Sequence, residues 1–274
     1  MSQPETEARS EPSAPPPSAQ APELQEAAKY GPAGRLIGTL LSPGETFEDV
    51  SRRPTWLAPL LIAMLTAAAA FWFYNWRANP DYPRIIRNQI KQQLDRRGQQ
   101  ISDEDLQKGI NIQLALVKFY PAFGAVFTAI TYFIVAGIFA LAMLLMQAQT
   151  TFKKILSVIA WSMCSVGLVG AIVRCASLML RDPDSLREVD FRQWASLSAT
   201  NLAFLLPGDV SAPVRALAQS LDVFSIWLLI LLIIGLAAIG GSKRITKSKT
   251  ATVVVGLWIV WVLFYVGLAS MGFA

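Results

Sequence analysis

The chain has 274 residues, of which 53% are apolar and 16% are charged. Soluble domains carry roughly 25% charged residues, so this composition is typical of a membrane protein and argues against an ordinary soluble enzyme. Histidine is absent, and the two cysteines are Cys164 and Cys175. These counts exclude histidine-dependent zinc sites, Ser-His-Asp and Cys-His catalysis, and a framework of several disulfides.

Residues 1–30 predict a disordered tail, because Pro, Ala, Ser, Glu and Gln dominate them and leave little apolar surface to bury. The tail has no apolar core and so does not match a cleavable signal peptide. We expect the first apolar run to act as an uncleaved signal anchor, and residues 31–274 to form one membrane domain.

A lead-in punctuated by prolines precedes the first apolar run. It predicts a short helix on the cytoplasmic membrane surface, starting near Thr39 or Ser42. The apolar side of that helix would be formed by Leu40, Phe47 and Val50, and the basic residues that suit anionic lipid are Arg35, Arg52 and Arg53. A solvated linker is the alternative that the sequence leaves open.

Five apolar runs follow, and the predicted fold is an all-α integral membrane protein with five transmembrane helices. A run of about 20 residues crosses a hydrocarbon core of roughly 30 Å, and backbone polar groups in lipid need the internal partners that a helix supplies. The spans are predicted near residues 56–76, 119–147, 155–180, 222–241 and 251–273. A further stretch, residues 191–206, is interrupted by polar residues and predicts a short interfacial helix and not a sixth span.

The loop after the first span, residues 77–118, predicts two short helices. The first, within residues 83–97, has an apolar face among basic residues, which is typical of an amphipathic helix at the membrane interface. That face is formed by Ile85, Ile86, Ile90 and Leu94. A solvated hairpin is the alternative. Ser102 predicts the cap of the second helix, which we expect to continue into the second span.

The formal net charge is +5, and the charged residues lie in short stretches between apolar runs. Membrane topology requires this distribution, so the basic charge does not predict a nucleic-acid partner. Basic residues are concentrated in the loops 147–154 and 242–250 and before the first span. Five spans place all three on one side, which the positive-inside rule makes cytoplasmic. The expected protein is a multi-pass protein of the inner (plasma) membrane with a cytoplasmic N-terminus and an outward C-terminus. The loop 77–118, with eight basic residues, would lie outside, against the same rule.

Arg174 and Asp222 are the ionisable residues closest to the apolar runs. A charge in a span is usually paired or faces water, because burial alone is costly. Both residues would lie near the outer ends of their helices, so they form a candidate ion pair. The alternative is that Arg174 reaches the surface while Asp222 caps the fourth transmembrane helix.

No catalytic motif stands out: the sequence has no Walker A motif, no GxSxG and no carboxylate pair inside a span. The sequence therefore predicts neither an enzyme nor a cofactor or metal site. Cys164 and Cys175 would lie about 16 Å apart along one helix, so packing is their expected role.

Three stretches together resemble the Yip domain family (Ypt/Rab-interacting proteins), and especially its bacterial branch. Residues 41–59 contain "SP-x-x-TF" and "P-x-W-x-x-P", with Pro43, Phe47, Pro54, Trp56 and Pro59. Residues 151–161 are similar to the family's entry to the third span. Residues 221–227 carry Asp222, Phe224 and Trp227, and they are followed by Ile234-Gly-Leu236 and Lys247–Thr250. The resemblance implies a five-helix membrane domain with a cytoplasmic N-terminus.

Eukaryotic members of that family are associated with Rab GTPases, a role that does not carry over to the bacterial branch. We expect a non-enzymatic membrane organiser or partner-binding scaffold, with the tail and lead-in as its cytoplasmic contact surface. Membrane lipids and other membrane proteins are the expected partners, and self-association into an oligomer is compatible with the sequence. The alternative is a small permease or channel in which Arg174 and Asp222 line a polar path. A lipid-directed enzyme ranks lowest, because catalytic groups are missing.

Overall fold

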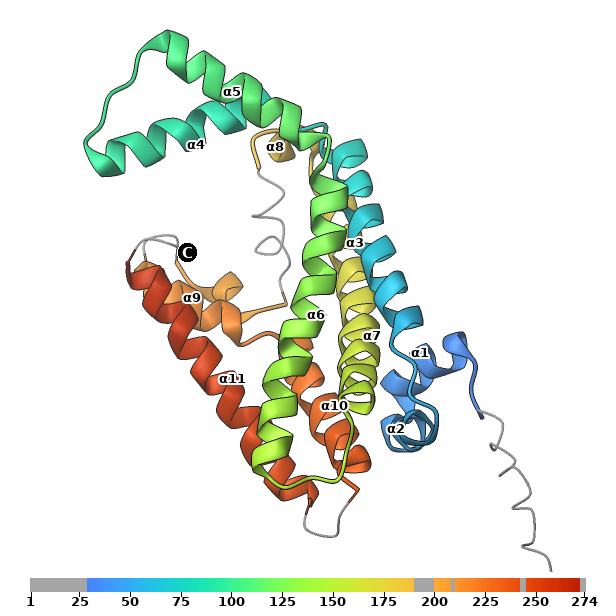
Figure 1. The fold of residues 1–274 in the computed structure, drawn as a ribbon. Helices are drawn as coiled ribbons and strands as arrows, with labels where there is room; N and C mark the ends of the chain where they lie inside the picture. Colours follow the sequence, from blue (N-terminus) through green and yellow to red (C-terminus); the bar gives the residue numbers. More distant parts are fainter. Residues whose placement is uncertain (1–28, 190–199, 208–209, 242–244, 272–274) are drawn as a thin grey trace, which may run out of the picture.

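The computed structural model describes residues 29–189, 200–207, 210–241 and 245–271 (Figure 1). Among these residues the secondary structure is helical, apart from one isolated antiparallel bridge between Asn201 and Asp222. The helices are α1 (Pro32–Leu41), α2 (Pro43–Arg52), α3 (Leu57–Ala78), α4 (Tyr82–Arg97), α5 (Asp103–Val117), α6 (Tyr120–Leu145), α7 (Phe152–Met179), α8 (Pro183–Leu186), η2 (Leu202–Leu205), α9 (Ala212–Ser220), α10 (Val223–Ile239) and α11 (Lys247–Ser270). The predicted tail lies outside the described residues up to residue 28, and most of the predicted interfacial helix at 191–206 does too.

Among the described residues, four helices have the length and hydropathy of a membrane span, namely α3, α6, α7 and α11. The helix at the predicted fourth span, α10, is apolar but has only 17 residues, which is about 25 Å. A close backbone contact ends it: Gly241 has φ +67°, and a Cβ there would lie 2.2 Å from the carbonyl oxygen of Gln149. The all-helical class is thus confirmed, with four helices in the described part of the chain that are long and apolar enough to cross a membrane, and a fifth crossing by α10 stays a prediction.

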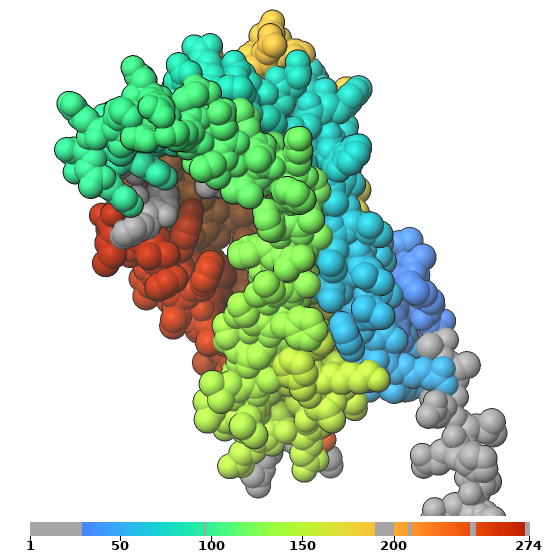
Figure 2. Space-filling model, turned by 45° about the horizontal axis from the view of Figure 1, so that its top comes forward, coloured from blue at the N-terminus to red at the C-terminus, as the bar shows by residue number. Residues whose placement is uncertain are grey.

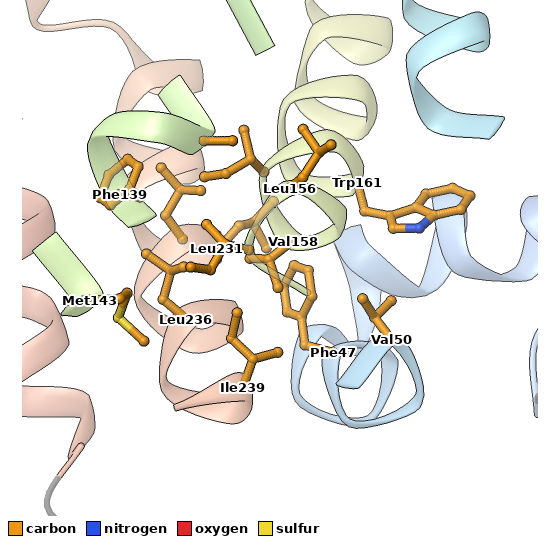
Figure 3. Close-up of a cluster of buried hydrophobic side chains, with 14 of the residues drawn as sticks. Phe47, Val50, Phe139, Met143, Leu156, Val158, Trp161, Leu231, Leu236 and Ile239 are labelled. Atoms are coloured by element: carbon orange, nitrogen blue, oxygen red, sulfur yellow. The ribbon is translucent and has the colours of Figure 1, made fainter. Parts of the chain in front are cut away.

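The centre of the bundle is α7, which contacts α1, α2, α3, α6 and α10. It runs from the end that carries the connections after α6 and α10, called here the loop end, to the end that carries α4 and α5, called the hairpin end (Figure 1). Near the loop end, nearly every residue of α7 from Ile155 to Val166 is buried. Figure 3 shows side chains of α2, α6, α7 and α10 meeting there in the main apolar core.

The helices α4 and α5 form a hairpin with a small core of its own, made by Ile86, Leu106 and Ile110. The apolar side of α4 therefore contacts α5, and the structure favours the hairpin over an α4 that lies with this side on lipid. Ser102 caps α5 by accepting a hydrogen bond of 3.1 Å from the backbone N–H of Asp105, as predicted.

The expected continuous helix from α5 into α6 is wrong, because α5 ends at Val117 and α6 begins at Tyr120. Pro121 explains the break. Its ring would collide with the carbonyl of Val117 in an uninterrupted helix, whereas the first turn of a new helix accepts it.

Candidate functional site

The two lead-in helices α1 and α2 dock on the bundle. Each begins with a proline as its first residue, Pro32 and Pro43, a position that suits the fixed φ of proline. α1 packs against α7, and α2 packs against α10 and α7. Phe47 and Val50 are fully buried in the main core. The expectation that these two side chains face the membrane is therefore wrong, because the bundle offers them a larger apolar surface.

An ion pair between Arg35 of α1 and Asp49 of α2 lies inside this lead-in. The Nε and Nη2 atoms of Arg35 each lie 2.8 Å from Oδ2 of Asp49, and both side chains are almost fully buried. Nη1 donates to the carbonyl of Arg53 and to the hydroxyl of Thr55, at 3.0 and 2.5 Å. The prediction that Arg35 faces anionic lipid is therefore wrong, because its guanidinium is buried against Asp49. The sequence carried no short-range signal for this pair, since its members belong to different helices.

Three motif stretches of the resemblance meet at one point, which we call the motif junction: Phe47, Val158 and Gly235. A Cβ atom built on Gly235 would lie 2.4 Å from Cγ1 of Val158 and 3.2 Å from the ring of Phe47. Only a residue without a side chain lets α2, α7 and α10 approach this closely. Figure 3 shows Phe47 between the helices at this point.

The segment before α1 is attached to α2 by polar contacts. The backbone N–H of Lys29 donates to Asp49, at 2.9 Å. The Nζ of Lys29 and the hydroxyl of Tyr30 both donate to Glu45, each at 3.1 Å. Hydrogen bonds from Lys29 and Tyr30 hold the pKa of Glu45 below its ordinary value. Hydrogen bonding with Tyr30 and Glu45 raises the pKa of Lys29.

The other motif residues begin the helices α3 and α10. Pro54 lies between α2 and α3, and Pro59 is buried in the first turn of α3. Trp56 precedes α3 and meets Phe133 of α6 edge to face, with ring centroids 5.7 Å apart. At α10, Phe224 packs against the main core and Trp227 is 42% exposed.

A polar cluster lies where α10 begins. Asp222 caps α10, accepting from the backbone N–H of Phe224, and also accepts from the hydroxyl of Thr200, both at 2.7 Å. Arg174 folds back along α7 until its Nη1 lies 3.4 Å from where a Cβ of Gly170 would stand. The capping role is thus observed, and the ion pair stays a prediction.

In the described part of the chain, no three His, Cys, Asp or Glu side chains converge as a metal site would require. The cysteines are not joined: Cys164 is buried in α7 and Cys175 is partly buried. The features with the most internal organisation are therefore the lead-in with its ion pair, the motif junction and the Asp222 cluster.

Long apolar helices around a buried central helix define a polytopic helical membrane protein. The model of the Yip1 domain family matches residues 37–271, so the chain belongs to this family. It is similar to the membrane protein YknW of Bacillus subtilis (strain 168), with 27% identity over 232 residues that cover 84% of this chain and 88% of the relative. No solved structure matches the chain significantly. The family expectation from the three sequence stretches is confirmed.

Proposed function

We propose that this protein is a five-span scaffold of the inner (plasma) membrane, which acts by binding another membrane protein and has no catalytic activity of its own. The observation that supports this proposal is the lateral opening, defined as the space between α6 and α11 below the α4–α5 hairpin. Figure 2 shows the surface hollowed there. In Figure 1, α11 leans away from α6 toward the hairpin end.

The two helices that flank the lateral opening, α6 and α11, are apolar and largely exposed in the described part of the structure. The main contacts of α11 are with α9 and α10. In the most apolar 18-residue stretch of each helix, 11% of α11 is buried, against 72% of α7. Large apolar side chains are exposed on α6 (Phe123, Phe127, Ile130 and Ile134) and on α11 (Val260, Trp261, Leu263 and Phe264). Helices associate in lipid mainly through van der Waals packing, so a helix that enters between two walls gains more contact than one on a flat face.

The proposed orientation is supported by lysines at helix starts. Lys153 and Lys154 lie in the first turn of α7, and Lys247 and Lys249 in the first turn of α11. Positive charge at a helix N-terminus is unfavourable to the helix dipole, so helix stability does not account for these lysines. The positive-inside rule does, if the loop end is cytoplasmic. In Figure 1, α10 runs from the middle of the bundle to the loop end, so the proposed fifth crossing would combine α10 with the chain that leads into it.

Site-specific photocrosslinking in native membranes tests the scaffold. A photoreactive amino acid replaces Phe264 of α11 or Phe127 of α6, which are 57% and 70% exposed, and a matched control replaces Trp72 of α3, which is 72% exposed. We expect one discrete protein adduct from the α6 and α11 positions and none from the control. Equal adducts at all three positions, or no adduct at any, would contradict partner binding in the lateral opening.

Deleting the lead-in is a poor test of partner binding. Removal of α1 and α2 would uncover Trp161, which is fully buried and, in Figure 3, extends from α7 toward these two helices. A loss of partners after that deletion would then report a damaged bundle and not a missing contact surface.

A further inference from the structure

We propose that α1 is embedded in the lipid leaflet at the loop end, where Ile37 and Leu41 contact acyl chains, while α2 lies at the polar surface of the same leaflet. This assigns a lipid-contacting surface to the lead-in and is independent of the proposed scaffold function. It requires only that α6 and α7 cross the membrane.

The depth of α1 along the bundle is the first argument. The hydroxyl of Ser165 donates to the backbone carbonyl of Leu36, at 3.2 Å. Ser165 lies well inside α7, about 20 Å along the helix from Phe152. The residue before α3, Trp56, contacts Phe133 of α6, about 18 Å from the loop end of that helix. Both contacts place the lead-in within the depth of a hydrocarbon core of roughly 30 Å.

The surface of α1 is the second argument. Its exposed residues carry no charge and are Pro32, Ala33, Gly34, Ile37 and Leu41. Its one charged residue, Arg35, is turned inward and is 2% exposed. Asp49 neutralises this guanidinium, and Thr55 and a backbone carbonyl accept from it. An isolated charge in lipid is strongly unfavourable, and this arrangement leaves none on the outer side of α1.

The separation of charge between α1 and α2 is the third argument. The exposed acids of the lead-in, Glu45 and Glu48, both belong to α2. Phe47 of α2 packs near Val158, about 9 Å from the start of α7, so α2 lies closer to the loop end than Leu36 of α1 does. A polar outer helix above an apolar inner helix follows the polarity gradient of a leaflet.

α1 also contacts α3, a helix with the length and hydropathy of a membrane span. Leu57 and Leu61 at the start of α3 are 54% and 48% exposed. Ile37 and Leu41 of α1 are 57% and 78% exposed. Acyl chains that cover the first turns of α3 would then cover α1 as well.

Spin-label accessibility tests the proposal on the full chain. Cys164→Ala and Cys175→Ser provide a cysteine-free background, into which a single cysteine is placed at Ile37 or Leu41, with Glu48→Cys as the matched control on α2. Each variant carries a nitroxide and is reconstituted alone into phosphatidylcholine–phosphatidylglycerol vesicles. Accessibility to oxygen, which concentrates in lipid, is compared with accessibility to a water-soluble nickel chelate.

We expect nitroxides at Ile37 and Leu41 to be accessible to oxygen and inaccessible to the nickel chelate. The nitroxide at Glu48 should be accessible to the nickel chelate and less accessible to oxygen. Nickel accessibility at Ile37 and Leu41 equal to that at Glu48 would place α1 in water and overturn the proposal. Inaccessibility to both reagents would show that protein, such as a second copy of the chain, covers α1, and would overturn it equally.

Discussion

Phe47 of α2 lies on the bare backbone of Gly235 in α10, where a Cβ would stand 3.2 Å from its ring and 2.4 Å from Val158. The three residues come from the three stretches that carry the family resemblance. The three stretches that resemble the family therefore meet in one packing contact, which joins the lead-in to α7 and α10.

Gly235→Ala is expected to destabilise the protein by about 1–3 kcal/mol, because the added methyl group overpacks the motif junction. The matched control is Gly256→Ala in α11, where nothing lies within 4 Å of the added Cβ. Thermal unfolding in detergent can be followed with a thiol-reactive dye in a Cys175→Ser background, since the remaining Cys164 is 1% exposed in the folded protein. Equal midpoints for the two variants would show that the junction tolerates a side chain.

Asp49→Ala is expected to cost about 3–5 kcal/mol, because it leaves the buried guanidinium of Arg35 without its counter-ion. Glu45→Ala is the control: it removes an acid of the same helix whose ion pair with Lys29 is exposed, and it should change the midpoint little. The double variant Arg35→Met with Asp49→Leu removes both charges and should recover most of the loss. A double variant as unstable as Asp49→Ala would mean that the pair itself, and not the unpaired charge, matters.

The attachment of Lys29 and Tyr30 to α2 should depend on pH. The lowered pKa of Glu45 means that this contact stabilises the fold above the ordinary carboxyl pKa and is lost as pH falls through the lowered value. The raised pKa of Lys29 means that the stability contributed by its ammonium is fully present below the ordinary lysine pKa. This contribution is lost as pH rises through the raised pKa. A nitroxide at Gly31→Cys should be least mobile between these limits. Glu45→Gln should abolish the change in nitroxide mobility at low pH. If this change persists in the variant, the group that titrates is not Glu45.

How far the sequence predicted the fold depended on whether a feature was local. Apolar length predicted the four long helices, and the caps Ser102 and Asp222 follow from residues within one turn. The ends of α10, Val223 and Ile239, lie within two residues of the predicted span 222–241, whereas the contact of Gly241 with Gln149 joins distant segments and was not predicted. The Arg35–Asp49 pair was missed for the same reason. For α4 the apolar face was predicted correctly, but periodicity alone does not say whether lipid or another helix covers it.

Asp222 has two candidate roles, which a double-mutant cycle separates. Asn caps a helix about as well as Asp, so Asp222→Asn removes the charge and keeps the cap. If the carboxylate also pairs with Arg174, the variants Asp222→Asn and Arg174→Gln should show a coupling of about 0.5–3 kcal/mol in thermal unfolding. If the effects of the two substitutions on thermal unfolding are additive, Asp222 acts as a helix cap and does not pair with Arg174. The permease alternative is tested on the same variants by solute flux into vesicles: a scaffold shows none in any of them, whereas a permease loses its flux with either charge.

The number of crossings can be decided by two reporters placed on opposite sides of α10 in the sequence. One is inserted after Gly98, at the tip of the α4–α5 hairpin, and the other is fused after Ala274. Alkaline phosphatase, active only outside the cytoplasm, and green fluorescent protein, fluorescent only inside when exported unfolded, are tested at each position. The segment between the two positions contains α6, α7, α10 and α11. If all four cross, the reporters lie on the same side, and with a cytoplasmic loop end both positions give active phosphatase. If α10 does not cross, three crossings separate the positions, and the two fusions give opposite signals whichever way the protein is oriented.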